Sequence, residues 1–594
     1  MRKKYLVKQI GADFNRIASE LKVDPLTVRL MVNRGVKEED MQTYLHPSEE
    51  DLNDPTELYN IREAASEIAG YIRNQKKIRI IGDYDIDGIM STYILVSCLR
   101  NLGADVDYRI PHRVRDGYGL NERLVEEAKE EGREAIITCD NGIAAFDAVK
   151  RAREIGLDIV VTDHHIVPFE EVDGEKREIL PPANFVVNPH LAEDTSSFKE
   201  ICGAVVAWKV CFVVYDEMGV DDSFVWKRLE NAGFATVGDV MPLVLENRSL
   251  VKLTLNRLRD TENLGMRTLI RVAGIDRDKL SAFSIGFVLG PMMNASGRLS
   301  DATLGVELLL TEDEAEAERL ATKLFELNQA RKDQTEQGTA KALEAAAEYE
   351  DDKVLVIYLP EVNESVAGIV AGRVRENTGK PSIVLVRATK ADDSAVDRVL
   401  VKGSGRSIEA FSMYEELHKC SDLMVKFGGH PMAAGLSLYE DDVDELRRRL
   451  NENTTLTDED LVEKVYLDAQ MPLSYLNQKL VEEIDRLDPF GNQNEKPVFG
   501  ASKIPVVSAR EIGKEGQYLK FTLRTENGGT IDALMFRGCE DFKDHFFEEY
   551  GEETYREMLS RRGSDVKLTF TFYPSLNTFR DETKVQVMIS DIIL

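Results

Sequence analysis

Apolar runs that end in acidic side chains recur in the first third of the chain. Residues 77–82 (KIRIIG) predict a short buried strand. Apolar positions at helical spacing from Ile89 predict a helix that ends at Gly103, because glycine adopts the left-handed conformation of a helix C-terminus at little energetic cost. The same pattern returns at 134–139 and at 157–167. Continuous apolar strands alternating with helices predict an α/β fold with a parallel sheet covered on both faces.

Polar side chains follow each of these predicted strands. Ligands bind beyond the carboxyl ends of the strands in parallel sheets, so we expect these side chains at one edge. Asp239 follows another short apolar run, but sequence spacing does not place it at the same edge. For any single Asp the alternative is a helix N-cap. The candidates are Asp83, Asp85 and Asp87 after the first strand, Asp140 after the second, and Asp163, His164 and His165 after the third.

So many carboxylates at one edge need a compensating cation. Two like charges about 4 Å apart repel by about 1 kcal/mol in water and about 4 kcal/mol at an intermediate dielectric. Carboxylate oxygen with imidazole suits manganese, iron or zinc, and magnesium where oxygen dominates. Two such ions would activate water and clamp phosphate oxygens, which predicts hydrolysis of a phosphodiester or phosphoanhydride. The sequence has no GxSxG, Walker A or GxGxxG motif to support acyl transfer, an ATP-driven motor or a dinucleotide oxidoreductase.

The rest of the chain predicts three further parts. An acidic, Ala/Leu-rich stretch at 311–350 predicts a long helix, and strand-type sequence from 352 to 438 predicts a second α/β lobe. Glycine-rich turns are expected within that lobe at 401–407 (VKGSGRS) and 426–435 (KFGGHPMAAG). Five strand runs after Val465 predict a small barrel of the oligonucleotide-binding type.

Composition narrows the class of protein. A chain of 594 residues predicts several domains, and it contains no apolar run near the 18 residues that would span a membrane. The six scattered cysteines predict reduced core thiols, and the N-terminal residues lack the pattern of a secretory signal, so we expect a cytoplasmic protein. A net charge of −31 argues against nucleic acid as a partner. That argument is weak, because phosphate binding needs a local basic groove and not a basic protein.

Three motifs carry a resemblance to a known family. "DYDIDG" at 83–88, "CDNG" at 139–142 and "TDHH" at 162–165, in this order, resemble the signature of the DHH phosphoesterase family. The resemblance continues through "NASGRLSDA" at 294–302 and "GSGRSIEAF" at 403–411, and is greatest to the 5′ to 3′ exonucleases of that family that act on single-stranded DNA.

The resemblance implies a function and a set of roles. It implies release of 5′-mononucleotides by two-metal hydrolysis in DNA repair and recombination, with a helicase of the RecQ type and a single-strand-binding protein as further partners. Asp163 and His165, and also Asp87, would orient the metal ligands. Two Mn²⁺ or Mg²⁺ ions would be held by Asp83, Asp85, Asp140, His164 and Asp239.

The second lobe would then bind the substrate phosphates. The resemblance implies that Arg298, Ser404 and Arg406 hold the terminal 5′ phosphate, because guanidinium groups bind phosphate oxygens bidentately. Without the resemblance, surface salt bridges are the favoured reading of these arginines. His430 would reach the scissile phosphate, with Gly428 and Gly429 permitting close backbone approach.

Two other functions stay open at this point. The first is a DHH phosphodiesterase for short oligonucleotides or cyclic dinucleotides, and the second is a non-catalytic DNA-binding scaffold. The predicted division of the chain is an N-terminal helical segment (1–59), a DHH domain (60–275), a connecting helical region (276–350), a DHH-associated domain (351–455) and an oligonucleotide-binding (OB) barrel (456–594).

Overall fold

The computed structural model describes residues 3–113, 116–172, 175–388, 398–560, 565–580 and 582–593. The chain forms two compact units. The first contains residues 53–241 and 253–463, and the second contains residues 4–52, 242–252 and 464–594. No helix in the described ranges is both long and apolar enough to cross a bilayer. The six cysteines are free and buried, as predicted.

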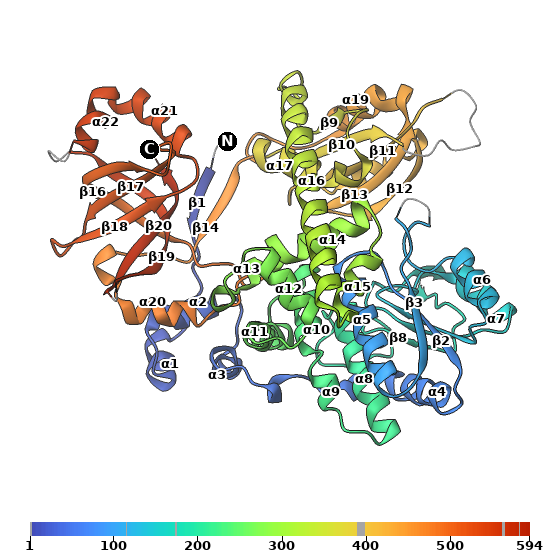
Figure 1. Ribbon diagram of the computed structural model, residues 1–594. Helices are drawn as coiled ribbons and strands as arrows, with labels where there is room; N and C mark the ends of the chain where they lie inside the picture. The colour runs from blue at the N-terminus through green and yellow to red at the C-terminus, as the bar shows by residue number, and fades with distance from the viewer. Residues whose placement is uncertain are drawn as a thin grey trace. The chain divides into compact units, whose positions relative to one another are not determined.

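A five-stranded parallel sheet forms the first part of unit 1 (Figure 1). Its order is β3-β2-β4-β5-β8. The chain runs from β2 outward to β3 and returns to β4 on the other side of β2, so the order reverses between β2 and β4. Open α/β sheets bind ligands at such a switch point. The strands are β2 (Lys77–Ile81), β3 (Asp105–Arg109), β4 (Ala135–Cys139), β5 (Asp158–Thr162) and β8 (Phe185–Val187).

Helices cover both faces of this sheet, which confirms the predicted α/β class. The apolar sides of α6 (Glu122–Glu130) and α7 (Phe146–Glu154) pack on one face, in a core that includes Ile136 and Ile159. On the other face lie α5 (Ile86–Asn101) and α8 (Gly203–Met218). Both are buried over nearly their whole length, which explains why their sequences are apolar on all sides.

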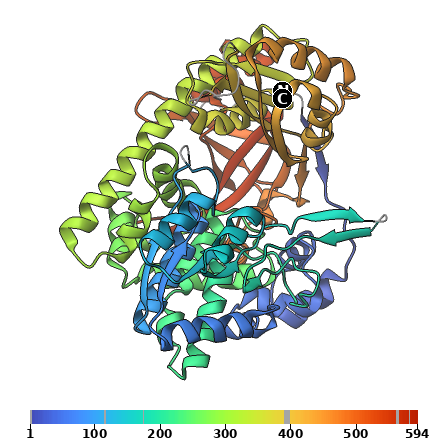
Figure 2. The same cartoon turned by 90° about the vertical axis from the view of Figure 1, so that its right-hand side faces the viewer.

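The long predicted helix is α16 (Glu314–Ala347), which leads to the second sheet of unit 1 (Figure 1 and Figure 2). That sheet has the order β12-β13-β11-β10-β9, in which β9 and β10 are parallel and the other pairs antiparallel. Helix α17 (Ala367–Thr378) packs on one face with the end of α16. The strands are β9 (Leu355–Tyr358), β10 (Ser382–Arg387), β11 (Leu400–Arg406), β12 (Met424–His430) and β13 (Ala433–Tyr439).

The glycine-rich stretch at 401–407 lies in a strand, so the turn predicted there is wrong. The stretch at 426–435 contains a turn at residues 431 and 432, between β12 and β13, but its first two glycines lie in the strand before it. Gly403 and Gly405 lie within β11, and a Cβ on Gly405 would lie 2.8 Å from the Met413 sulfur. Gly428 and Gly429 lie within β12. At Gly403 and Gly405 the missing side chain serves close packing against a neighbouring residue, which is another common role of glycine in a strand.

The C-terminal barrel closes as predicted. Its strand order is β16-β17-β18-β20-β19, and pairing between β16 and β19 completes the circle. All pairs are antiparallel except β18 with β20. Two helices, α21 (Cys539–Tyr550) and α22 (Glu552–Leu559), lie between β18 and β19 in the chain. The strands are β16 (Phe499–Ile512), β17 (Tyr518–Arg524), β18 (Thr530–Met535), β19 (Lys567–Phe579) and β20 (Glu582–Ile593).

The N-terminal residues belong with the barrel. Ile17, Leu30 and Tyr44 share one hydrophobic core with barrel residues. The segment is not wholly helical, because β1 (Lys3–Val7) pairs with β14 (Glu463–Leu467). Removing the barrel would therefore strip the N-terminal helices of their core, so a simple C-terminal truncation would not test barrel function cleanly.

Candidate metal centre

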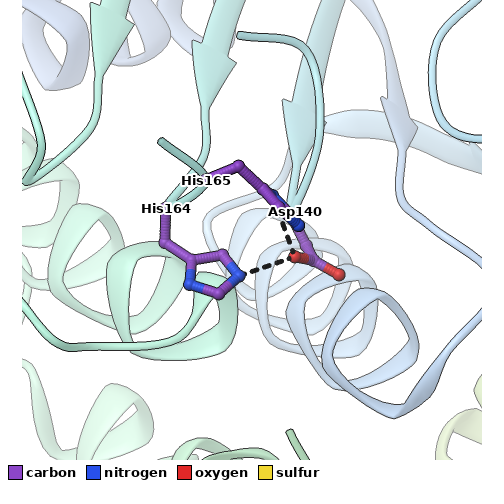
Figure 3. Close-up of side chains that lie close together, drawn as sticks. All are labelled: Asp140, His164 and His165. Atoms are coloured by element: carbon purple, nitrogen blue, oxygen red, sulfur yellow. Dashed lines mark ion pairs between the residues drawn. The ribbon is translucent and has the colours of Figure 1, made fainter. Parts of the chain in front are cut away.

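The acidic side chains that follow β2, β4 and β5 gather at one edge of the parallel sheet, as predicted. Asp83, Asp85 and Asp140 can each place one oxygen within 4.8 Å of the other two. Asp140 also groups in this way with His164 and His165. Figure 3 shows both imidazoles beside the Asp140 carboxylate, with His164 Nε2 3.1 Å from Asp140 Oδ1 and His165 Nδ1 3.9 Å from the same oxygen.

The structure also brings Asp239 to this edge, which the sequence could not decide. Asp239 is the C-cap of α10 (Leu229–Gly238), and its Oδ2 lies 3.9 Å from His164 Nε2. Asp87 Oδ2 lies 3.5 Å from the same nitrogen, so Asp87, His164 and Asp239 form a third possible ligand group. His164 therefore joins the turn after β5 to a helix end far away in the sequence.

Two of these acids have capping roles as well. The Asp85 carboxylate accepts the backbone N–H groups of Asp87 and Gly88 and so caps α5. Asp87 accepts N–H groups at the start of α8, from Gly203 at 2.6 Å and Ala204 at 2.8 Å. The positive end of the α8 dipole stabilises a negative charge on Asp87. The alternative prediction that an Asp here caps a helix is thus correct for Asp85 and Asp87. Both side chains nevertheless also belong to the possible ligand groups.

The position of Asp140 is imposed by its surroundings. Asp140 has a φ of +59°, a left-handed conformation that costs about 1–3 kcal/mol outside glycine. The next residue, Asn141, holds the turn. Its Nδ2 donates to the carbonyls of Ile81 (3.0 Å) and Cys139 (2.9 Å), and its Oδ1 accepts the N–H of Leu120. Strained backbone held by such contacts is typical of functional sites.

The carboxylates of this cluster have too little positive charge near them to balance their negative charge. Burial, followed by the Asp85 charge, raises the pKa of Asp83 to about 8. Burial, followed by the charges of Asp87 and Asp85, raises the pKa of Asp239 to about 8. The pKa of Asp140 is also raised, by burial and by Asp87. Asp83 Oδ2 is buried and has no hydrogen-bond partner among the described residues. A buried acceptor in a cluster of oxygen and imidazole ligands fits divalent cations.

Asp163 and His165 form a supporting pair. Asp163 accepts N–H groups from Ile143, His164 and His165, and its Oδ1 lies 2.7 Å from His165 Nδ1. Burial raises the pKa of Asp163, but the contacts with His165, with the Ile143 N–H and with His164 together leave that pKa below its ordinary value. Burial lowers the pKa of His165, but the Asp163 carboxylate and the charges of Asp87 and Asp239 together raise that pKa to about 9.

Tyr118 completes this support and was not singled out from the sequence. Its hydroxyl lies 3.0 Å from His165 Nε2 and donates to the Asp140 carbonyl at 3.1 Å. Both nitrogens of the His165 ring therefore have partners, which fixes its orientation. The loop at 117–121 (GYGLN) contains two glycines, but nothing in its local sequence pattern indicates that its tyrosine reaches Asp140.

Replacing Asp163 by Asn should release the His165 imidazole. We expect the pKa of His165 in the metal-free protein to fall from about 9 toward its ordinary value near 6.5, because the hydrogen bond and the charge of Asp163 are the main contributions that raise it, while burial remains. NMR titration of the histidine ring protons measures this, with His165→Gln for assignment and the exposed Asp147→Asn as a control. An unchanged pKa near 9 would contradict the pairing.

The predicted phosphate-binding side chains converge in part. Arg298, at the end of α14 (Gly290–Leu299), donates to the Ser365 carbonyl at 3.0 Å. A Cβ on Gly368, in the first turn of α17, would lie 3.0 Å from Arg406 Nη2 and 3.1 Å from Ser404 Oγ. The three side chains thus meet the same turn, at the N-terminus of a helix, where backbone N–H groups favour an anion.

Arg298 has no counter-charge at this turn. Burial, followed by the charges of Arg113 and Arg331, lowers the pKa of Arg298 to about 10. Burial, followed by the Arg375 charge, lowers the pKa of Arg406 too. Within the part of the chain that the structure describes, no carboxylate forms an ion pair with Arg298. Buried cations without partners are costly unless a ligand supplies the negative charge.

A pocket of about 340 Å³ adjoins this turn and adds basic residues that the sequence analysis did not name. Ser404 and Gly428 line it together with Arg113, Lys402 and Lys426. His430 does not line this pocket and is not in any of the ligand groups of the metal centre. It is exposed at the end of β12, so its contact with a phosphate stays a prediction.

Three segments match families of known domains. Residues 77–227 match the DHH family N-terminal domain, residues 351–455 the DHHA1 domain, and residues 467–591 the RecJ OB domain. The parallel sheet, the second sheet and the barrel lie in these three segments, respectively.

Curated relatives match most of the chain. The chain is 36% identical to the single-stranded-DNA-specific exonuclease RecJ of Bacillus subtilis, an alignment that covers 88% of this chain and 64% of that protein. It is 31% identical to RecJ of Salmonella typhimurium, with 97% of each chain covered. The crystal structure of RecJ from Thermus thermophilus in complex with Mn²⁺ has a TM-score of 0.79 at 27% identity, and the match covers 100% of this chain and 80% of that one. This chain therefore belongs to the RecJ family of DHH proteins.

Proposed function

We propose that this protein is a 5′ to 3′ exodeoxyribonuclease specific for single-stranded DNA, which hydrolyses phosphodiester bonds with two divalent cations, Mn²⁺ or Mg²⁺. The observation that carries the proposal is the cluster at the sheet edge, where buried carboxylates with raised pKa values meet two imidazoles and outnumber the positive charge there. The names of the relatives and the metal-bound RecJ structures support the reaction and the cofactor. A scaffold without catalysis would not need this cluster.

The cations would be held by five side chains at the sheet edge: Asp83, Asp85, Asp140, His164 and Asp239. Bound divalent cations supply polarisation of phosphate oxygens and a lowered pKa for water. Asp163 and Tyr118 fix the His165 ring, and Asp87 ties the cluster to α8. These contacts keep the donor atoms in place before substrate arrives, which reduces reorganisation during the reaction.

Arg298, Ser404 and Arg406 would hold the terminal 5′ phosphate. The two guanidinium groups, the Ser404 hydroxyl and the N-terminus of α17 would together make an anion site. Such a site beside the metal centre selects the 5′ end and limits each cut to the first nucleotides. His430 would reach the scissile phosphate, and Gly428 and Gly429 would permit the close approach of the backbone.

Single-stranded DNA is the partner that the OB domain match supports. A RecQ-type helicase and a single-strand-binding protein are further partners that we propose, since each would supply or protect the single strand. A role in DNA repair and recombination follows from such partners. The five-part division of the chain predicted from the sequence also remains a proposal.

A digestion assay tests the proposed polarity. With Mn²⁺ present, a 5′-labelled single strand should release labelled mononucleotide at once, whereas a 3′-labelled strand should release its label late. Labelled mononucleotide released first from the 3′ end would contradict the proposal, as would equal digestion without any divalent cation.

Arg298→Ala and Arg406→Ala should each weaken the response to a 5′ phosphate. A hydrogen bond to a charged group contributes about 1.5–3 kcal/mol, so we expect kcat/KM on 5′-phosphorylated strands to fall by about 10- to 100-fold. Strands with a 5′ hydroxyl should lose much less. Arg373→Ala is the matched control, because Arg373 is exposed on α17 and pairs with Glu376. Equal losses on both kinds of strand would contradict the phosphate role.

A further inference from the structure

A large cavity in unit 1 has no part in the site described above. Its volume is about 1050 Å³, and all the residues that line it belong to unit 1. They come from the second half of α5, from α9 (Ser223–Trp226) and the start of α10, from residues 256–263 and the first turn of α12 (Leu264–Val272), and from residues 309–314. Ligand pockets in proteins measure about 300–1,000 Å³, so this cavity has room for a small molecule.

Two helices connect this cavity to the metal centre. Helix α5 is capped by Asp85, and Tyr93 and Ser97 on the same helix line the cavity. Helix α10 has Glu230 in its first turn, at the cavity, and ends at Asp239. At 1.5 Å per residue, Tyr93 and Ser97 lie about 12 and about 18 Å along α5 from Asp85, and Glu230 lies about 14 Å along α10 from Asp239. The cavity is therefore separate from the metal centre.

One buried carboxyl group lines the cavity. Glu230 is only 6% exposed. Thr261 Oγ1 donates to Glu230 Oε1 at 2.7 Å, and no residue in the described ranges donates a hydrogen bond to Oε2. Burial raises the pKa of Glu230 to about 7, although the Thr261 hydrogen bond and the charges of Arg228 and Arg257 oppose this rise. A buried carboxylate oxygen without a donor is costly unless a ligand supplies one.

An arginine at the start of α10 is held in position beside this carboxyl group. The Arg228 guanidinium lies 4.3 Å from the ring centroid of Phe224 and 5.1 Å from that of Tyr93. Its Nε donates to the Ser97 hydroxyl at 2.9 Å. Within the part of the chain that the structure describes, its two terminal nitrogens make no hydrogen bond and no carboxylate forms an ion pair with it. A guanidinium held in this way can stack on a planar ring and bind an anion.

A second arginine, Arg267, makes the cavity more favourable for an anion. Its side chain has neither an ion pair nor a hydrogen bond among the described residues. Arg267 also lines a neighbouring cavity of about 420 Å³, together with Arg271 and Arg277. Five basic and five acidic side chains line the larger cavity, although the protein has a net charge of −31. An anion is therefore repelled less here than the net charge alone would suggest.

We propose that this cavity binds a nucleoside phosphate, with the base at Glu230 and Arg228 and the phosphate at Arg267. The base would stack on the Arg228 guanidinium and donate a hydrogen bond to Glu230 Oε2. Guanine presents two adjacent donors, N1–H and the 2-amino group, so guanine nucleotides should bind best. The 5′-mononucleotides that the proposed reaction releases and the nucleoside triphosphates of the cell share this chemistry. The site does not depend on the proposed function.

Equilibrium dialysis of the full chain with labelled dGMP tests the site. EDTA is present, so that no cation at the metal centre holds the nucleotide. The wild type should bind dGMP saturably, and Arg267→Ala should weaken binding by about 10- to 100-fold, as for the loss of a hydrogen bond to a charged group. Arg319→Ala is the matched control, because Arg319 is exposed, pairs with Glu316 and lines neither cavity. A wild type that binds no dGMP, or binds inorganic phosphate as tightly as dGMP, would overturn the inference.

Glu230→Gln tests the contact with the base. Gln keeps the size of the side chain and an oxygen that accepts from Thr261, but it replaces Oε2 by an amide donor. Thymine has carbonyl oxygens on both sides of its single N–H, so the wild type should bind dGMP about 10-fold more tightly than dTMP, and the variant should lose this preference. A wild type that binds the two equally would overturn the assignment. Tighter binding of GTP than of dGMP would support triphosphates as the ligands, and weaker binding would support the released mononucleotides.

Arg406→Ala separates this cavity from the site proposed for the 5′ phosphate. The variant should bind dGMP as tightly as the wild type, because Arg406 does not line the cavity. Loss of binding in Arg406→Ala, together with unchanged binding in Arg267→Ala, would show that the nucleotide occupies the 5′-phosphate site. That result would overturn the inference and leave the proposed function intact.

Discussion

Replacing Asp140 by Asn should abolish nuclease activity without unfolding the protein. Asp140 belongs to two of the three ligand groups, and its Oδ1 faces the His164 ring. Loss of its charge removes several kcal/mol of transition-state stabilisation that a bound metal would supply. At 1.36 kcal/mol for each factor of ten, we expect kcat to fall by about 10³-fold or more.

The fold should survive this change for a specific reason. Asn keeps the shape of the side chain and removes one charge from a group of mutually repelling carboxylates. The metal-free variant should therefore melt at the wild-type temperature or above it. Asp147→Asn, on the exposed side of α7, is the control and should keep full activity. A variant at position 140 that digests DNA at the normal rate would show that the centre is assigned wrongly.

The stabilising effect of divalent cations should increase steeply with pH. In the metal-free fold Asp83 and Asp239 have pKa values near 8, whereas their unfolded values are near 3.8. A carboxyl group whose pKa is raised in the folded protein does not reduce stability while it is protonated in both the folded and the unfolded state. The free energy of unfolding then decreases as pH rises from about 4, the unfolded pKa, through about 8, the folded pKa. At 1.36 kcal/mol per pKa unit the loss amounts to several kcal/mol.

Bound cations would remove this loss, because they balance the charges and compete with protons for the same oxygens. The melting temperature with saturating Mn²⁺ minus that without metal should be small at pH 5.5 and large at pH 8.5. Differential scanning fluorimetry in buffered EDTA or Mn²⁺ measures it, and Asp140→Asn should flatten the dependence. A difference that stays constant or shrinks with pH would contradict the linkage.

The parallel sheet and most of its acidic edge could be predicted from the sequence. Continuous apolar runs such as β4 have few alternatives, and the carboxyl end of each run fixes where Asp83, Asp140 and Asp163 must lie. The closed barrel was also predictable, because its strands alternate and are separated by turn residues. Both inferences depend on local patterns that tertiary structure preserves.

Other parts of the site depend on packing between distant segments. Asp239 ends a helix and reaches His164 because α10 packs across α5 and α8. Tyr118 reaches Asp140 from a loop, and no local period marks it. Gly403 and Gly405 resemble turn residues in sequence, but their missing side chains make room for Leu385 and Met413. Sequence spacing cannot distinguish a glycine needed for a turn from one needed for close packing.

Anomalous diffraction from crystals soaked in Mn²⁺ tests the account most directly. We expect two peaks at the sheet edge, within bonding distance of Asp83, Asp85, Asp140, His164 and Asp239, and their loss in Asp140→Asn crystals. Crystals that show no manganese there at saturating concentration would contradict the account.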